Sequence, residues 1–137
     1  MSFSIREAIK QALLANPEFA ALVPSGMIWS QFAPSSTSPA GPWVVMTAIS
    51  DQELGAHDGN GNLAKQRFQF NVGGTDKEIV DTVLAILNQQ FNGVNYNYVD
   101  GTGTHEITFL HADSRDGWDE TSRTYHPSVD LFIWYNY

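Results

Sequence analysis

Four histidines are the side chains whose chemistry would suit a metal site or an acid–base site. They are His57, His105, His111 and His126. None stands with another in a ligand spacing such as His-Glu-x-x-His. His105 and His111 would share one face of a strand but lie about 20 Å apart along it, too far to bind one zinc ion. We therefore expect surface or strand-end histidines, with no metal and no catalytic role.

Two acidic clusters are the other candidates for bound ions. The first comprises Asp51, Glu53 and Asp58 with Asn60, and the second comprises Asp113, Asp116, Asp119 and Glu120. The first lacks the spacing and the final bidentate glutamate of a calcium loop, so solvated loop charge explains both clusters better. Gly59-x-Gly61 and Gly101-x-Gly103 lack the strand-to-helix context of a nucleotide-binding loop, and no serine stands in a nucleophile-elbow pattern. The sequence predicts no enzyme and no cofactor.

The composition is that of one globular domain, residues 1–137, with 42% hydrophobic residues. No cysteine is present, which excludes disulfides and thiolate ligands. Fifteen acidic against seven basic residues give a net charge of −8. The basic residues are scattered along the sequence, so we expect no tight binding of nucleic acid. No apolar run approaches the roughly 20 residues of a membrane span, so we expect no membrane partner.

One long central helix, Thr75–Phe91, organises the predicted fold. Thr75 and Glu78 stand in the capping-box relation, and apolar residues recur at three- and four-residue spacing as far as Phe91. Gly93 follows where a left-handed cap would end the helix. Seventeen residues would give a rod of about 25 Å. A second capping box opens an N-terminal helix at Ser4, and Asn16 caps a short helix after it.

Strand-like segments lie on both sides of the central helix. They are Trp43–Ser50, Lys65–Val72, Glu106–His111 and Val129–Tyr135. The order of helix, strands, helix and strands predicts an α+β domain. In this prediction, a mostly antiparallel sheet is packed by the long central helix and the N-terminal helix.

The final strand is apolar on both faces, because Phe132 and Trp134 oppose Leu131 and Ile133. Such a strand must be covered twice. One cover is the central helix, whereas the other could be the N-terminal helix or another subunit, and both remain open. Because the chain ends here, we expect this strand near a sheet edge and predict an oligomer interface at Phe132 and Trp134.

A series of features in the first two-thirds of the chain carries a family resemblance. The N-terminal helix is followed by Asn16-Pro17-x-Phe19-x-x-Leu22 and a Pro-rich loop. Pro42-Trp43-Val44-Val45 comes next, then a Gly-containing hairpin, Arg67-Phe68-Gln69-Phe70 and a helix opened by Thr75. This order resembles the phage tail terminator or tail-completion family, whose members commonly show Pro-Tyr-Val-Val where Trp43 stands here. The chain after Gly93 matches nothing in this pattern.

The resemblance implies a structural protein of the virion tail or neck, assembled in the host cytoplasm. It implies a homo-oligomeric ring, usually hexameric, that caps the tail tube protein and docks to the head-side connector protein. DNA would pass through this ring without specific binding, and neither catalysis nor a cofactor is implied. We predict that a glycine-rich hairpin tip contacts the tube or a ring neighbour through Glu53, Gly55, Asp58, Gly59 and Gly61. The alternatives are another neck or tail-tube adaptor ring, or a small ligand-binding domain or hydrolase using His111 and an acidic loop expected at Asp113–Arg123.

Overall fold

A computed structural model of the chain describes residues 4–23, 25–30, 42–55, 62–119 and 124–136. Its strands are β1 (Ile28–Ser30), β2 (Trp43–Gly55), β3 (Asn62–Gly73), β4 (Asn95–Asp100), β5 (Gly103–Arg115), β6 (Trp118–Asp119), β7 (Thr124–Tyr125) and β8 (Ser128–Asn136). Its helices are α1 (Ile5–Leu14), α2 (Pro17–Leu22) and α3 (Lys77–Ala85), with a 3-10 turn η1 (Ser25–Met27) and a π-helical segment η2 (Ile86–Gln90). In the described ranges, no helix is long and apolar enough to cross a membrane.

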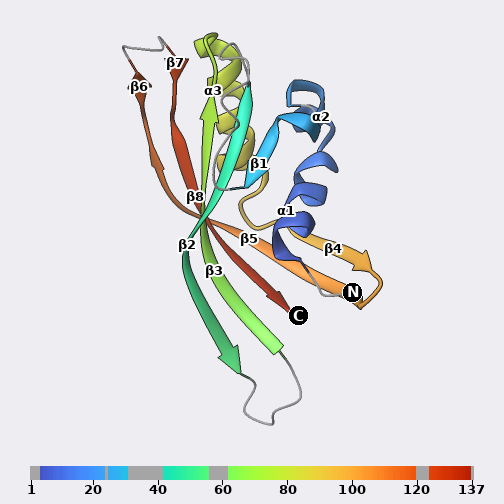
Figure 1. Cartoon of the computed structure of the whole chain (residues 1–137). Helices are drawn as coiled ribbons and strands as arrows, with labels where there is room; N and C mark the ends of the chain where they lie inside the picture. Colours follow the sequence, from blue (N-terminus) through green and yellow to red (C-terminus); the bar gives the residue numbers. More distant parts are fainter. Residues whose placement is uncertain (1–3, 24, 31–41, 56–61, 120–123, 137) are drawn as a thin grey trace.

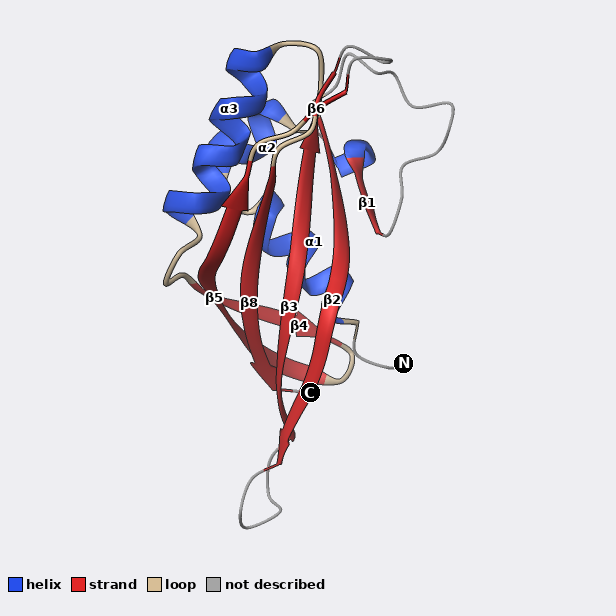
Figure 2. Cartoon of the chain, turned by 90° about the vertical axis from the view of Figure 1, so that its left-hand side faces the viewer, coloured by secondary structure: helices blue, strands red, loops and turns tan. Residues whose placement is uncertain are grey.

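Six strands form one curled sheet in the order β1-β2-β3-β8-β5-β4, and β6 and β7 form a separate pair. β1 pairs with β2 in parallel, and the other neighbours are antiparallel. The pairing shifts between Ala48 and Ser50 in β2 and between His111 and Asp113 in β5. Bulges of this kind bend a strand and increase its twist. The sheet therefore curls around the helices, which lie on its concave side (Figures 1 and 2).

The core lies between the concave face of the sheet and the helices. Alternate residues of the central strands point into it, as period-two alternation requires. They include Phe68 and Phe70 of β3, Leu131 and Ile133 of β8, and Ile107 and Phe109 of β5. Ile9 and Leu13 of α1, Phe19 of α2, Val83 of α3 and Leu87 of η2 complete the same buried cluster.

The caps of the first two helices are formed as the sequence predicts. The Ser4 side chain accepts a hydrogen bond from the Glu7 amide at 3.3 Å. The Asn16 side chain accepts one from the Phe19 amide at 3.0 Å, with Pro17 in the first turn of α2. These bonds satisfy amide groups that a helix start leaves without an intrahelical partner.

The predicted α+β fold with one long central helix is wrong. Strands dominate the structure as a curled half-barrel, and the helices are short, α3 having only nine residues. The apolar periodicity does continue to Phe91, but residues Ile86–Gln90 are π-helical. The prediction placed the N-terminal cap of α3 one residue too early: the cap is Asp76, whose side chain accepts from the amides of Glu78 and Ile79.

The final strand is also not near an edge of the sheet. β8 pairs with β3 on one side and β5 on the other, so it lies in the interior of the sheet (Figure 2). The expected acidic loop, Asp113–Arg123, instead begins within the end of β5 and includes β6, whereas residues 120–123 lie outside the described residues. The edge strands of the six-stranded sheet are β1 and β4.

Candidate functional site

The convex face of the sheet, turned away from the helices, carries a mixed aromatic and cationic surface. Because Phe68 and Leu131 point into the core, their strand neighbours Arg67 and Phe132 point outward. The register places Arg67 opposite Phe132, and Lys65 opposite Trp134. We call this surface the outer-face patch, defined as Lys65 and Arg67 of β3, Leu110 and Arg115 of β5, and Phe132 and Trp134 of β8.

Cationic side chains lie on both aromatic rings of the patch. Lys65 Nζ is 4.3 Å from the centroid of the Phe132 ring and 4.9 Å from that of Trp134. Arg67 Cζ lies 5.6 Å from the Phe132 centroid. Each such contact contributes about 0.5–1 kcal/mol at a partly exposed site. The rings are half-buried, and their outward surface is covered in part by positive charge.

Beneath the cations lies a buried carboxylate. Asp130 of β8 is only 2% exposed. Its Oδ2 accepts from Arg67 Nε at 2.9 Å and Nη2 at 2.7 Å, and from Arg115 Nη2 at 3.3 Å. Its Oδ1 is buried, and no group among the described residues forms a hydrogen bond with it. A buried charge needs such pairing, and here two guanidinium groups meet at one oxygen. Asp130 therefore holds Arg67 and Arg115 side by side against the sheet.

The structure thus brings the predicted interface residues Phe132 and Trp134 together with four residues that the sequence did not single out. These are Lys65, Arg67, Arg115 and Asp130. The alternation within β3 is enough to put Arg67 on the face of the sheet that Phe68 does not occupy. What the sequence lacked was the pairing of β3 with β8 and of β8 with β5, which joins segments far apart in the chain.

The predicted contact loop is described only in part. Glu53 and Gly55 belong to the last residues of β2, where they pair with Ala64 and Asn62 of β3. Asp58, Gly59 and Gly61 lie outside the described residues. The loop remains a prediction, and the outer-face patch is the better-defined surface.

The three described histidines, His105, His111 and His126, do not form a common site. His105 is buried: its Nδ1 donates to the Asn136 carbonyl at 2.9 Å, and its Nε2 lies 2.7 Å from Thr102 Oγ1. His111 is exposed, with Nε2 at 2.9 Å from Ser114 Oγ. His126 lies 5.3 Å from Trp43 between ring centroids, and His57 is outside the described residues. Across the described part of the chain, no three potential metal-ligating residues gather at one point.

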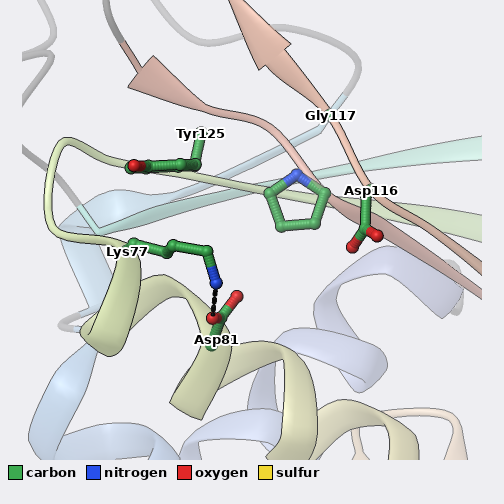
Figure 3. A pocket seen from close by; sticks show the side chains of 6 residues that line it. Lys77, Asp81, Asp116, Gly117 and Tyr125 are labelled. Atoms are coloured by element: carbon green, nitrogen blue, oxygen red, sulfur yellow. Dashed lines mark hydrogen bonds and ion pairs between the residues drawn. The ribbon is translucent and has the colours of Figure 1, made fainter.

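A hollow of about 450 Å³ lies where α3 begins, beside β7. It is lined by Lys77, Asp81, Asp116, Gly117, Tyr125 and Pro127 (Figure 3). Lys77 Nζ donates to Asp81 Oδ2 at 2.6 Å, and this bond raises the pKa of Lys77. The two charged groups that α3 contributes are therefore already paired with each other, which leaves the hollow a weak candidate for a charged ligand.

Comparison with known proteins identifies the class: phage tail structural proteins. The model of the family described as "Tail completion protein gp17" matches residues 7–136, and the chain belongs to this family. The resemblance predicted from the sequence is confirmed, as is a place in the tail or neck of the virion. A solved chain titled "Virion of native gene transfer agent (GTA) particle" matches with a TM-score of 0.61 at 14% identity, covering 99% of this chain and 100% of that one. This likeness concerns the fold. The comparison with curated proteins gave no match.

Proposed function

We propose that the protein caps the phage tail tube as a homo-oligomeric ring, hexameric by expectation, and joins it to the head-side connector. The observation that carries this proposal is the family match over residues 7–136, almost the whole chain. The outer-face patch supports it, because aromatic residues and arginine are the types enriched at the centres of protein interfaces. In this proposal Phe132 and Trp134 contact a neighbouring protein in the assembled virion.

The charge distribution supports the passage of DNA through the ring without specific binding. The chain carries a net charge of −8. Of its basic residues, Lys65 lies on aromatic rings, and Arg67 and Arg115 are paired with Asp130. Tight phosphate binding requires several basic side chains directed at the backbone. An acidic subunit in which these three of the seven basic side chains are engaged suits a passage that DNA crosses without being retained.

The hairpin that continues from β2 into β3 is the proposed contact with the tail tube or a ring neighbour. Its predicted contact residues are Glu53, Gly55, Asp58, Gly59 and Gly61. The paired ends of β2 and β3 that lead into residues 56–61 extend away from the helices (Figure 1). A projecting hairpin can reach an adjacent protein without disturbing the core, which lies between the sheet and the helices.

The test is negative-stain microscopy of the purified protein, alone and mixed with tails assembled without it. We expect a ring in the free protein or on the tails, with extra density at the head-proximal end of the tube. Density at an internal position of the neck or tube would favour the adaptor-ring alternative. Failure to bind tails under any condition in which the protein remains folded would contradict the proposal.

A further inference from the structure

We propose that neighbouring copies in the ring are joined by backbone hydrogen bonds between two open edges of the sheet. One edge is β4 of one copy, and the other is the outer edge of β2, residues 47–55, of the next copy. The contact is head-to-tail, because two different edges of the same chain take part. This inference rests on the proposed ring, and it deepens that proposal by naming the two edges that meet.

The first edge is β4, which ends the six-stranded sheet. It pairs with β5 on one side, and no described strand pairs with it on the other. The Phe109 amide of β5 donates to the Val94 carbonyl at 3.0 Å, just before β4 begins. Opposed residues of an antiparallel pair are hydrogen-bonded alternately, so the amides and carbonyls of Asn95 and Asn97 point away from β5. Both residues are exposed, and their backbone groups are open to a partner strand.

β4 also lacks the features that keep an open edge from pairing. Natural sheets protect their edges with proline, lysine or a bulge. β4 contains neither proline nor lysine, and its register with β5 is unbroken. Its one charged residue, Asp100, stands at the turn, where it accepts from the Thr102 amide. A hollow of about 480 Å³ lies beside the strand, lined by Gln11 of α1 and residues 96–99, and it offers space for alternate side chains of an added strand.

The matching edge belongs to β2. β1 covers only three residues at the start of β2, and no described strand pairs with the outer edge of residues 47–55. In β3, the Val72 amide donates to the Pro127 carbonyl beside β8, and so points away from β2. By the same alternation, the backbone of Gln66 also points away from β2. Its partner Asp51 therefore directs its own amide and carbonyl out of the sheet edge.

The arrangement of the strands favours pairing between copies. Within one chain, β3, β8 and β5 separate β2 from β4 in the sheet. The open part of β2 leads into the hairpin, and its end extends away from the helices, where another copy can meet it (Figure 1). β1, the other edge strand, has three residues and would match only half of the six in β4. Repeated contacts between unlike edges close into a ring when the rotation between copies allows it.

The charges of the two edges agree with a contact made by the backbone. Residues 47–55 carry Asp51 and Glu53, β4 carries Asp100, and neither edge has a basic residue. Ion pairs between these edges therefore cannot hold the copies together. Because the chain has a net charge of −8, raised salt should strengthen association by screening the repulsion between copies. A contact made mainly of surface ion pairs would instead weaken.

The test removes one edge amide at a time. Asn97→Pro and Asp51→Pro each delete an outward amide, which a sheet edge tolerates because no hydrogen bond within the chain is lost. Asn97→Ala and Asp51→Ala are the matched controls, because they remove the same side chains and keep the amides. Thermal melting verifies folding, and sedimentation velocity measures self-association. We expect each proline variant to associate at least about tenfold more weakly than its alanine control.

A mixture of the two proline variants distinguishes this contact from one between like edges. Each copy keeps one intact edge, so the intact β2 of one variant can meet the intact β4 of the other. The next contact would join two altered edges, and the mixture should therefore stop at dimers. If β4 paired with β4 of another copy, Asp51→Pro would associate like Asp51→Ala, and this result would overturn the inference.

Cross-linking tests the pairing without a proline. The chain has no cysteine, so Asn97→Cys and Asp51→Cys can be mixed and treated with a short bismaleimide, both alone and on tails assembled without the protein. The control mixture replaces Asp51→Cys by Thr82→Cys, an exposed position on α3. We expect more cross-linked dimers in the first mixture than in the control. Equal yields would overturn the inference, even where a proline variant fails to fold.

The failure of this inference can be told apart from the failure of the proposed function. Folded proline variants that form rings and cap tails as well as their alanine controls would refute the edge contact and leave the proposed function standing. Negative-stain microscopy counts the capped tails. A folded parent that neither forms rings nor binds tails would instead refute the proposed function itself.

Discussion

At the scale of single residues, Asp130 determines how the outer face is organised. It is buried on a face that would otherwise be open, and it draws two arginines onto the sheet. Burying a carboxylate costs several kcal/mol unless opposite charge compensates it. The buried pair is therefore less favourable for folding than apolar side chains in its place would be, but it fixes the direction of two guanidinium groups. Groups fixed in this way suit a surface that binds a partner.

Arg67→Leu should destabilise the fold by about 3 kcal/mol, because Asp130 would keep only its longer contact with Arg115. Chemical denaturation of the two proteins measures this difference. The informative control is the double variant in which Arg67 and Asp130 are both Leu, since replacing a whole buried pair by apolar groups is often nearly neutral. If the double variant is as unstable as Arg67→Leu, the loss comes from packing and not from the orphaned carboxylate.

We expect Asp100 to make the stability of the fold depend on pH in the acidic range. The Thr102 hydroxyl and amide both donate to Asp100 Oδ1, and the hydroxyl bond is the main reason that the pKa of Asp100 lies below its usual 3.8. A lowered pKa in the folded state contributes stability above the unfolded value, and this contribution is lost as pH falls through the folded value. The thermal unfolding midpoint should therefore fall more steeply with decreasing pH, below pH 3.8, for the parent than for Asp100→Asn. Parallel curves for the two proteins would argue against this role.

At the scale of elements, most local features were predictable and the long-range ones were not. The Ser4 and Asn16 caps depend on hydrogen bonds spanning three residues, which the sequence displays directly. The strands at Trp43 and Lys65 show in their composition and alternation. The extent of α3 was overestimated because Ile86 and Leu87 of η2 are buried, and apolar spacing does not distinguish a π-helical turn from an α-helical one.

Strand order is where sequence reasoning failed for both the fold and the candidate site. Nothing in the residues of β8 shows that it lies between β3 and β5, because that depends on pairing with distant segments. The same pairing decides that Lys65 lies beside Trp134 and that Asp130 meets Arg67 and Arg115. The alternation of β8 alone shows that Phe132 and Trp134 share the face opposite Leu131 and Ile133, whereas their cationic partners could not be predicted from it.

The start of β2 is held against the end of β3 by a close aromatic contact. Trp43 pairs with Gly73, and a Cβ at position 73 would overlap the indole ring of Trp43. Gly73→Ala should therefore destabilise the domain by about 1–3 kcal/mol, as overpacking of a close contact does. Thermal denaturation measures the effect. Adding Trp43→Ala should remove most of the penalty of the alanine at 73, and a penalty that persists would place the strain in the backbone.

At the scale of the whole molecule, Trp134 tests whether the outer-face patch is an interface. Trp134→Ser should fold, because the ring is half-buried on the outer face, but it should associate at least about thirtyfold more weakly if the residue lies at an interface centre. Sedimentation of the parent and the variant measures the difference. Val99→Ser is the matched control, since Val99 is 69% exposed on β4 and lies outside the patch, and the substitution leaves its backbone groups in place. Equal association of parent and Trp134→Ser would remove Trp134 from the interface.

Helices fill the concave side of the curled sheet, and this limits where DNA could pass through an assembly of this protein. Side chains from α1, α2, α3 and η2 occupy the hollow of the half-barrel, where they pack with Phe68, Leu131 and Ile133. No duplex can use that hollow as a conduit without unfolding the subunit. The channel of a ring built from this chain would therefore be lined by the outer surfaces of several copies. Its width would follow from the number of copies and the angle between them, and not from the curvature of the sheet.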